Sequence, residues 1–184
     1  MSDVKVGGDE FGLTELGREQ AQKAAENLKE ILAKDEDHYN PEDVIVLTSP
    51  LLRTKETAEL IHKGLGCKAE VRVDHRLIER QYGELDLKSV EEYLEPIWLA
   101  DQKSMHRSIH GVEGLLDIAE RMVELLRDLE QECSGKVFVL VSHGDPILKM
   151  KVLYHGLPLN HLPHRGAILN CSITPFRFSQ GDMK

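Results

Sequence analysis

The sequence predicts one domain of the α/β class, in which a mostly parallel central sheet is flanked by helices. Two apolar runs support this prediction, DVIVLTS at residues 43–49 and VFVLVSHGDP at residues 137–146. Each is typical of a strand that is buried on both faces and ends in small polar residues. Helical patterns alternate with these runs, and a β-α-β order favours parallel pairing. The composition shows no linker, so we assign all 184 residues, 1–184, to a single domain.

The first half of the chain contains two helical patterns. Thr14 can cap a helix that ends in the polar run 34–40, and its apolar side chains share one face: Ala21, Ala24, Ala25, Leu28 and Leu32. After the strand at 43–49, residues 51–65 carry apolar side chains at helical spacing, and Gly64 and Gly66 are suitable stop signals. Residues 69–73 alternate, which predicts a shorter strand.

The second half begins with an irregular polar segment, residues 76–86, which we expect to form a loop over the carboxyl edge of the sheet. A helix over 90–100 is expected despite Pro96, and residues 113–132 carry the clearest amphipathic stripe. The strand at residue 137 follows. We then expect a helix near 147–154 and a final strand over 171–178, where Pro175 favours an edge position.

Composition excludes several classes of function. The formal net charge of −9 argues against nucleic-acid binding, although a few local cations could still hold a small phosphorylated substrate. No apolar run is long enough for a signal peptide or a membrane span. Three scattered cysteines fit neither a metal site nor a full disulfide set, so we expect a cytoplasmic protein without a membrane partner. The GGDEF letters at 7–11 match the motif of diguanylate cyclases, but no Asp-rich metal segment follows, and we interpret them as a loop.

Two candidate functional residues follow the buried strands. Ligands of open α/β sheets bind outside the carboxyl ends of the strands, where His143 comes directly after one apolar run. Arg53 lies in the first turn of the helix that follows the other run, where a guanidinium and helix N–H groups can bind one anion. The structural alternatives are a hydrogen-bonded core histidine, and an arginine paired with Glu56 or Glu59 on a solvated face.

Six segments in order resemble the histidine phosphatase superfamily, which has the phosphoglycerate mutase-like fold. They are LTELGREQA at 13–21, SPLLRTKETA at 49–58, RLIERQYGELD at 76–86, VEGLLDIAERM at 112–122, VSHGDPI at 141–147 and NCSIT at 170–174. The resemblance implies a three-layer sandwich, no cofactor and a small phosphorylated substrate or free phosphate as ligand. It leaves a homodimer open.

The resemblance also implies roles for individual residues. Arg53 matches the phosphate-binding arginine, His143 the histidine that stabilises the transferring phosphoryl group, and Glu79 the acid that protonates the leaving oxygen. Glu79 would need a raised pKa to hold that proton near neutral pH. Ser142 and Thr54 are weaker candidates for the pocket lining, with capping or packing as the alternative. Two further matching positions, Glu113 and Arg121, are interpreted as structural.

One part of the family pattern is missing from this sequence. The family's nucleophile is a histidine in an Arg-His-Gly motif at the end of a first strand, and no such tripeptide occurs here. The nearest analogue, Ile109-His110-Gly111, lies in another part of the chain, and Val4–Val6 could form at most a stub of the strand. We therefore expect impaired or absent turnover and a gap in the sheet with unpaired backbone groups. Either an active enzyme has lost this part, the explanation we favour, or a true variant has rebuilt it.

The leading functional hypothesis is a phosphomonoester hydrolase of the histidine phosphatase type, acting through a phosphohistidine. Phosphoryl transfer of the phosphoglycerate mutase type is one alternative. A non-catalytic pseudophosphatase that binds a phosphorylated ligand or a protein is another, favoured by the missing nucleophile. His155, His161 and His164 could ligate zinc, but their spacing matches no metal motif, which favours a solvated loop.

Overall fold

The fold is an α/β arrangement in which a parallel sheet is flanked by helices, which confirms the predicted fold class. The computed structural model describes residues 11–34, 40–86, 88, 90–105, 109–132, 135–160 and 168–177. Within them, a three-stranded sheet has the order β2-β1-β3. Its strands are β1 (Val44–Thr48), β2 (Arg72–Val73) and β3 (Val137–Val141), and both pairings are parallel.

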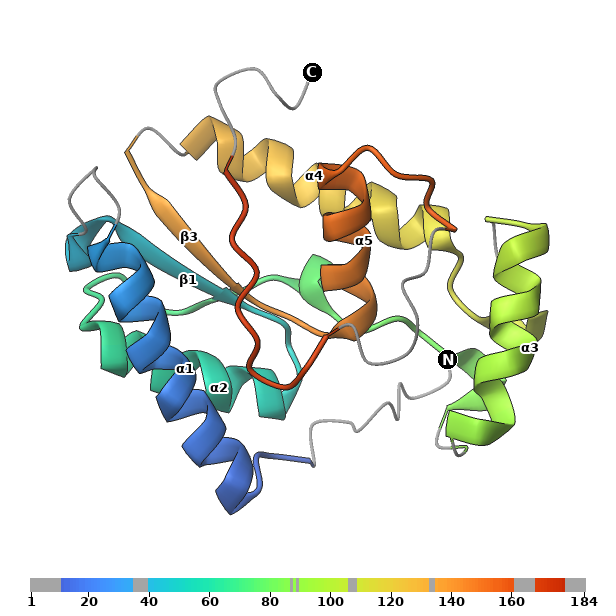
Figure 1. The fold of residues 1–184 in the computed structure, drawn as a ribbon, viewed down its shortest axis with the longest axis horizontal. Helices are drawn as coiled ribbons and strands as arrows, with labels where there is room; N and C mark the ends of the chain where they lie inside the picture. Colours follow the sequence, from blue (N-terminus) through green and yellow to red (C-terminus); the bar gives the residue numbers. More distant parts are fainter. Residues whose placement is uncertain are drawn as a thin grey trace.

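The two faces of β1 define the three layers (Figure 1). Its side chains alternate in direction, so Val44 and Val46 pack against α1 (Glu15–Ala33) and α2 (Leu52–Leu65). Ile45 and Leu47 pack on the other side against apolar residues of α4 (Leu115–Glu132) and against Met150 of α5 (Gly144–Tyr154). All five residues of β1 are buried, which explains their unbroken apolar character.

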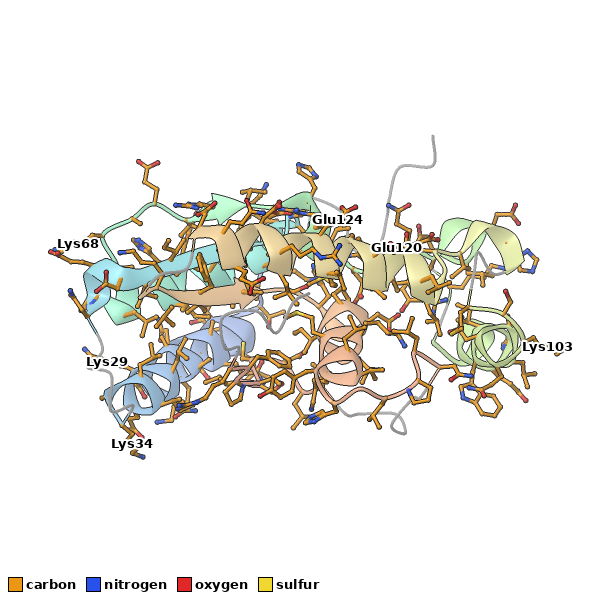
Figure 2. The ribbon with its side chains drawn as sticks, turned by 90° about the horizontal axis from the view of Figure 1, so that it is seen from above. Lys29, Lys34, Lys68, Lys103, Glu120 and Glu124 are labelled. Atoms are coloured by element: carbon orange, nitrogen blue, oxygen red, sulfur yellow. The ribbon has the colours of Figure 1, made fainter. Side chains whose placement is uncertain are left out.

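The helix ends follow the predicted signals. The Thr14 hydroxyl caps α1 by accepting from the Gly17 N–H at 3.1 Å, and Gly66 ends α2 with a left-handed φ of 72°. A Cβ at Gly64 would lie 2.6 Å from the Ala25 Cβ, so this glycine lets α2 approach α1 closely. The outer side of α4 is charged, as Glu120 and Glu124 show in Figure 2.

A second, smaller apolar cluster joins α3 (Val90–Lys103) to the chain around it. It contains Leu85, Ile97 and Val112, with the Tyr82 ring packed against them. Leu85 belongs to a 3₁₀ turn, η3 (Gly83–Leu85), and a second 3₁₀ turn, η4 (Ile109–Gly111), leads towards α4. The helix α3 continues through Pro96 and ends three residues beyond the predicted boundary at Ala100.

Two strand predictions need correction. The final strand expected over 171–178 is wrong for its described part, because residues 171–177 pair with no strand. Pro175 lacks an N–H group for pairing, and the Phe176 ring instead packs edge to face on Tyr154 with ring centroids 5.2 Å apart. The strand expected over 69–73 is also shorter, since only Arg72 and Val73 pair with β1.

The expected gap is not found between the described strands. Paired residues run from Val44 opposite Val137 to Thr48 opposite Val141, so β1 and β3 are direct neighbours. Val137 to Leu140 are nevertheless only half-buried, whereas β1 is buried throughout, and β3 is therefore an edge of the described sheet. Val4–Val6, the GGDE letters at 7–10, His161 and His164 lie outside the described residues. None of the described helices combines the length and the apolar character needed to cross a membrane.

Candidate active site

The carboxyl ends of β1 and β3 lie side by side, because Thr48 stands opposite Val141 in the parallel register. The residues that follow the two strands therefore meet. The Ser49 backbone N–H donates to the Val141 carbonyl at 3.0 Å, and the Ser49 Oγ lies 2.8 Å from the His143 Nε2. His143, which is 8% exposed, thus sits at the predicted sheet edge.

The contact with Arg53 fixes the tautomer of His143. Its Nη2 lies 3.1 Å from the His143 Nδ1. Because a guanidinium can only donate, Nδ1 accepts, and Nε2 carries the hydrogen that is donated to Ser49. Burial, followed by the positive charges of Arg53 and Arg121, lowers the pKa of His143 to about 3. The ring is consequently neutral, and both of its nitrogens have hydrogen-bond partners.

The surroundings of Arg53 suit an anion. It lies in the first turn of α2, where the positive end of the helix dipole favours a negative charge. The carboxylate of Glu56, one of the two alternative partners named for Arg53, binds other donors. Glu56 accepts from Arg18 Nη2 at 3.1 Å and from the Leu13 N–H at 2.7 Å.

Glu79 reaches the same edge from the loop after a 3₁₀ turn, η2 (His75–Leu77). Its Oε1 accepts from the backbone N–H groups of Arg80 at 2.9 Å and Asp145 at 3.2 Å. Its Oε2 accepts from the Gly144 N–H at 3.2 Å. These bonds place the carboxyl group at the N-terminus of α5. They favour ionisation, but burial and the charge of Asp145 prevail and raise the pKa of Glu79 to about 7.

The hydroxyl groups of Ser142 and Thr54 are bound to the backbone. Ser142 Oγ donates to the Leu77 carbonyl at 2.7 Å and so ties the end of β3 to η2. Thr54 Oγ1 lies 2.7 Å from the Leu51 carbonyl and 3.1 Å from that of Ser49, which closes the turn between β1 and α2. These contacts support the structural alternative, capping or packing, for both Ser142 and Thr54.

Two residues at the site were missed by the sequence reasoning. Ser49 belongs to a quoted motif but received no role of its own. The signal that could have identified it is a small hydroxyl residue at the end of a buried strand. Asp145 follows the His143-Gly144 pair, and its contact with Glu79 depends on how the loop before η3 folds back. Glu113 and Arg121, interpreted as structural, form an ion pair at 2.8 Å.

Two further features are His110 and a hollow lined in part by Glu113, whose carbonyl accepts from Arg80 Nε at 2.9 Å. His110 is in η4, where its Nδ1 lies 3.3 Å from the exposed Glu84 carboxylate. A hollow of about 400 Å³ is lined by Gln81, Gly111, Glu113 and Asp117. In the described part of the chain, no group of three or more His, Cys, Asp or Glu side chains is arranged to hold a metal ion.

Comparisons with known proteins identify the family and the fold of the chain. The family model of the histidine phosphatase superfamily (branch 1) matches residues 2–184. The "Probable phosphoglycerate mutase GpmB" of Escherichia fergusonii is 27% identical over 176 residues, covering 91% of this chain and 74% of that protein. Its counterpart in Cronobacter sakazakii is 29% identical over 182 residues, with coverages of 95% and 77%.

Solved structures show the same architecture. A mycobacterial glucosyl-3-phosphoglycerate phosphatase aligns with a TM-score of 0.61 at 28% identity, covering 81% of this chain and 70% of that one. YhfR of Bacillus stearothermophilus aligns with a TM-score of 0.68 at 23% identity, with coverages of 87% and 75%, and supports the fold alone. The fold and the site define an α/β protein with an arginine and a histidine at the carboxyl edge of its sheet. The chain belongs to the histidine phosphatase superfamily.

Proposed function

We propose that this chain binds the phosphoryl group of a small phosphorylated metabolite, and that it is a phosphomonoester hydrolase with impaired turnover. The observation that carries the proposal is the Arg53–His143 contact of 3.1 Å beside the N-terminus of α2. A guanidinium and a helix N-terminus together form a favourable phosphate receptor. With a pKa of about 7, Glu79 can deliver a proton to a departing alkoxide near neutral pH.

We expect impaired turnover from this stretch of 184 residues because it lacks the family's nucleophile. Family members transfer the phosphoryl group to the histidine of an Arg-His-Gly motif, and these 184 residues contain no such motif. His143 is a poor substitute, because its Nδ1 lone pair accepts from Arg53 and its Nε2 hydrogen is donated to Ser49. The proposed chemistry is therefore binding and charge stabilisation with little covalent transfer.

A phosphate-binding assay tests the role of Arg53. Titration of the whole chain with 3-phosphoglycerate and inorganic phosphate, followed by calorimetry, should detect binding, and Arg53→Met should weaken it about 10- to 100-fold, the worth of a charge-assisted hydrogen bond. Arg72→Met is the matched control, because Arg72 lies in β2 and pairs with the exposed Glu132 at 2.7 Å. Equal affinities in Arg53→Met and the unsubstituted protein would refute the proposed site.

A turnover assay separates the remaining alternatives. Conversion of 3-phosphoglycerate into its isomer would favour the mutase alternative, which the names of the GpmB relatives support. Release of phosphate that disappears in His143→Ala would contradict a purely binding role. Failure to label any histidine with substrate phosphate would support the pseudophosphatase alternative.

A further inference from the structure

The outer edge of β3 has no partner among the described strands. β3 pairs with β1 along one side only, as Figure 1 shows. The Val141 carbonyl accepts from the Ser49 N–H after β1, and successive residues of a strand direct their backbone N–H and C=O groups to opposite sides. The backbone groups of Val139 and Val141 therefore face β1, whereas those of Phe138 and Leu140 face away from it. In the described part of the chain, no hydrogen bond reaches Phe138 or Leu140 from that side.

The two edges of the described sheet differ in their protection against association. Natural edge strands are kept short, or carry charged residues, prolines or bulges. The β2 edge has only two residues, Arg72 and Val73, and the Arg72 guanidinium pairs with Glu132 at 2.7 Å. β3 instead has five residues, all apolar, and its register with β1 is continuous. Because the first four residues of β3 are only half-buried, this apolar edge is open to a further strand.

The described chain offers the β3 edge no strand of its own. Residues 171–177, where a final strand was expected, pair with no strand, and the Phe176 ring packs on Tyr154 instead. An occupant of the edge must supply about five extended residues, the length of β3, with apolar side chains on both faces. Both faces are needed because the side chains of β3 pack alternately towards the cluster under α1 and α2 and the cluster under α4 and α5.

We propose that the edge of β3 pairs with the same edge of a second copy of this chain, antiparallel about a two-fold axis at Val139. This register overlaps both strands along their full length. Phe138 then stands opposite the partner's Leu140, and their outward backbone groups form about four hydrogen bonds over the two symmetric pairs. Val137 stands opposite the partner's Val141, and Val139 opposite its own copy. Every cross-strand pair is apolar and lies on one face, so both helix-covered layers continue across the interface.

Amide hydrogen exchange of the unsubstituted chain tests this pairing when it is measured by NMR at several protein concentrations, alongside sedimentation velocity. Where about nine-tenths of the chains are dimeric, the Phe138 and Leu140 N–H groups should exchange about 10-fold more slowly, because only the monomer exposes them. The Val139 N–H, which faces β1, is the matched control and should be protected at every concentration. A protein that stays monomeric at all concentrations would overturn the proposal. Protection of Phe138 and Leu140 in that monomer would assign the edge to another segment of the same chain.

A pair of cysteine variants tests the register. Val139→Cys brings the thiols of both copies together at the two-fold axis, where the Cα atoms of such a pair lie about 4.5 Å apart, within the reach of a disulfide. Val137→Cys is the matched control, because it lies on the same face but opposite the partner's Val141, too far from its own copy for a disulfide.

Oxidation should give a covalent dimer of Val139→Cys, whereas Val137→Cys should give no more than the unsubstituted protein with its native cysteines. Equal crosslinking of the two variants would overturn the register at Val139. Neither experiment involves phosphate binding or turnover, so its failure is distinct from failure of the proposed function.

Discussion

Replacing Glu79 with Gln should change how the free energy of unfolding depends on pH. The pKa of Glu79 is about 7 in the folded protein and has an ordinary value of 4.5. Between these values the folded state binds the proton more tightly than the unfolded state does. Glu79 therefore contributes stability that is present at low pH and is lost as the pH rises through about 7.

The size of the effect follows from the difference in pKa. At about 1.4 kcal/mol per pH unit, Glu79 should cost the unsubstituted protein about 2–3 kcal/mol of stability between pH 5 and pH 8. Gln does not titrate, so the Glu79→Gln variant lacks this loss. Its amide cannot accept from all three backbone N–H groups that the carboxyl oxygens face, but that cost is the same at every pH.

Urea unfolding at several pH values measures the difference. The free energy of unfolding of Glu79→Gln minus that of the unsubstituted protein should rise by about 2–3 kcal/mol from pH 5 to pH 8. All other titrating groups are common to the two proteins and cancel in this difference. A flat difference over the range would show that Glu79 titrates at an ordinary pKa, and the reasoning from burial and Asp145 would then fail.

Two further substitutions test the lowered pKa of His143 and the buried Arg80–Asp101 ion pair. His143 has a pKa of about 3 against an ordinary 6.5, so its stabilising contribution is lost as the pH falls below 6.5. The free energy of unfolding of His143→Asn minus that of the unsubstituted protein should therefore rise by about 2–3 kcal/mol from pH 7 to pH 4.5 in urea unfolding curves. Asp101→Ala leaves the buried Arg80 charge without its bidentate partner and should lower the free energy of unfolding by about 3 kcal/mol. The exposed pair of Arg72 is the comparison, since Glu132→Ala should cost less than about 1 kcal/mol in the same urea assay. Equal costs for the two alanine variants would contradict the assignment of Asp101 as a buried anchor.

The core of the fold was predictable because its signals are local. The apolar run of β1 is unbroken since both faces are buried. Thr14 marks the start of α1 through its hydroxyl, and Gly66 marks the end of α2 through its left-handed backbone and its N–H. The chain after residue 170 was not predictable in the same way. Its apolar residues resemble a strand, but Phe176 uses its ring to cover the core between β1 and α4 rather than to pair with a neighbour.

Candidate site residues could be named from the sequence, but their contacts could not. Arg53 and His143 each follow a recognisable strand end, so both could be named from sequence. Their hydrogen bond requires β1 and β3 to be neighbours, and no local sequence pattern predicts that these two strands pair. The same reason hid Ser49 and Asp145, whose partners lie 94 and 66 positions away.

The pairing of β1 with β3 also has a consequence for folding kinetics. Ser49 and His143 are separated by 94 positions, and closing so long a loop costs entropy before any contact compensates for it. During synthesis, α1, β1 and α2 emerge well before β3 does. The edge of β1 that pairs with β3 can form its hydrogen bonds only after β3 has been made. The Arg53 and His143 side chains are therefore assembled late, when the two halves of the chain dock, and refolding of this site should be slower than formation of the helices that frame it.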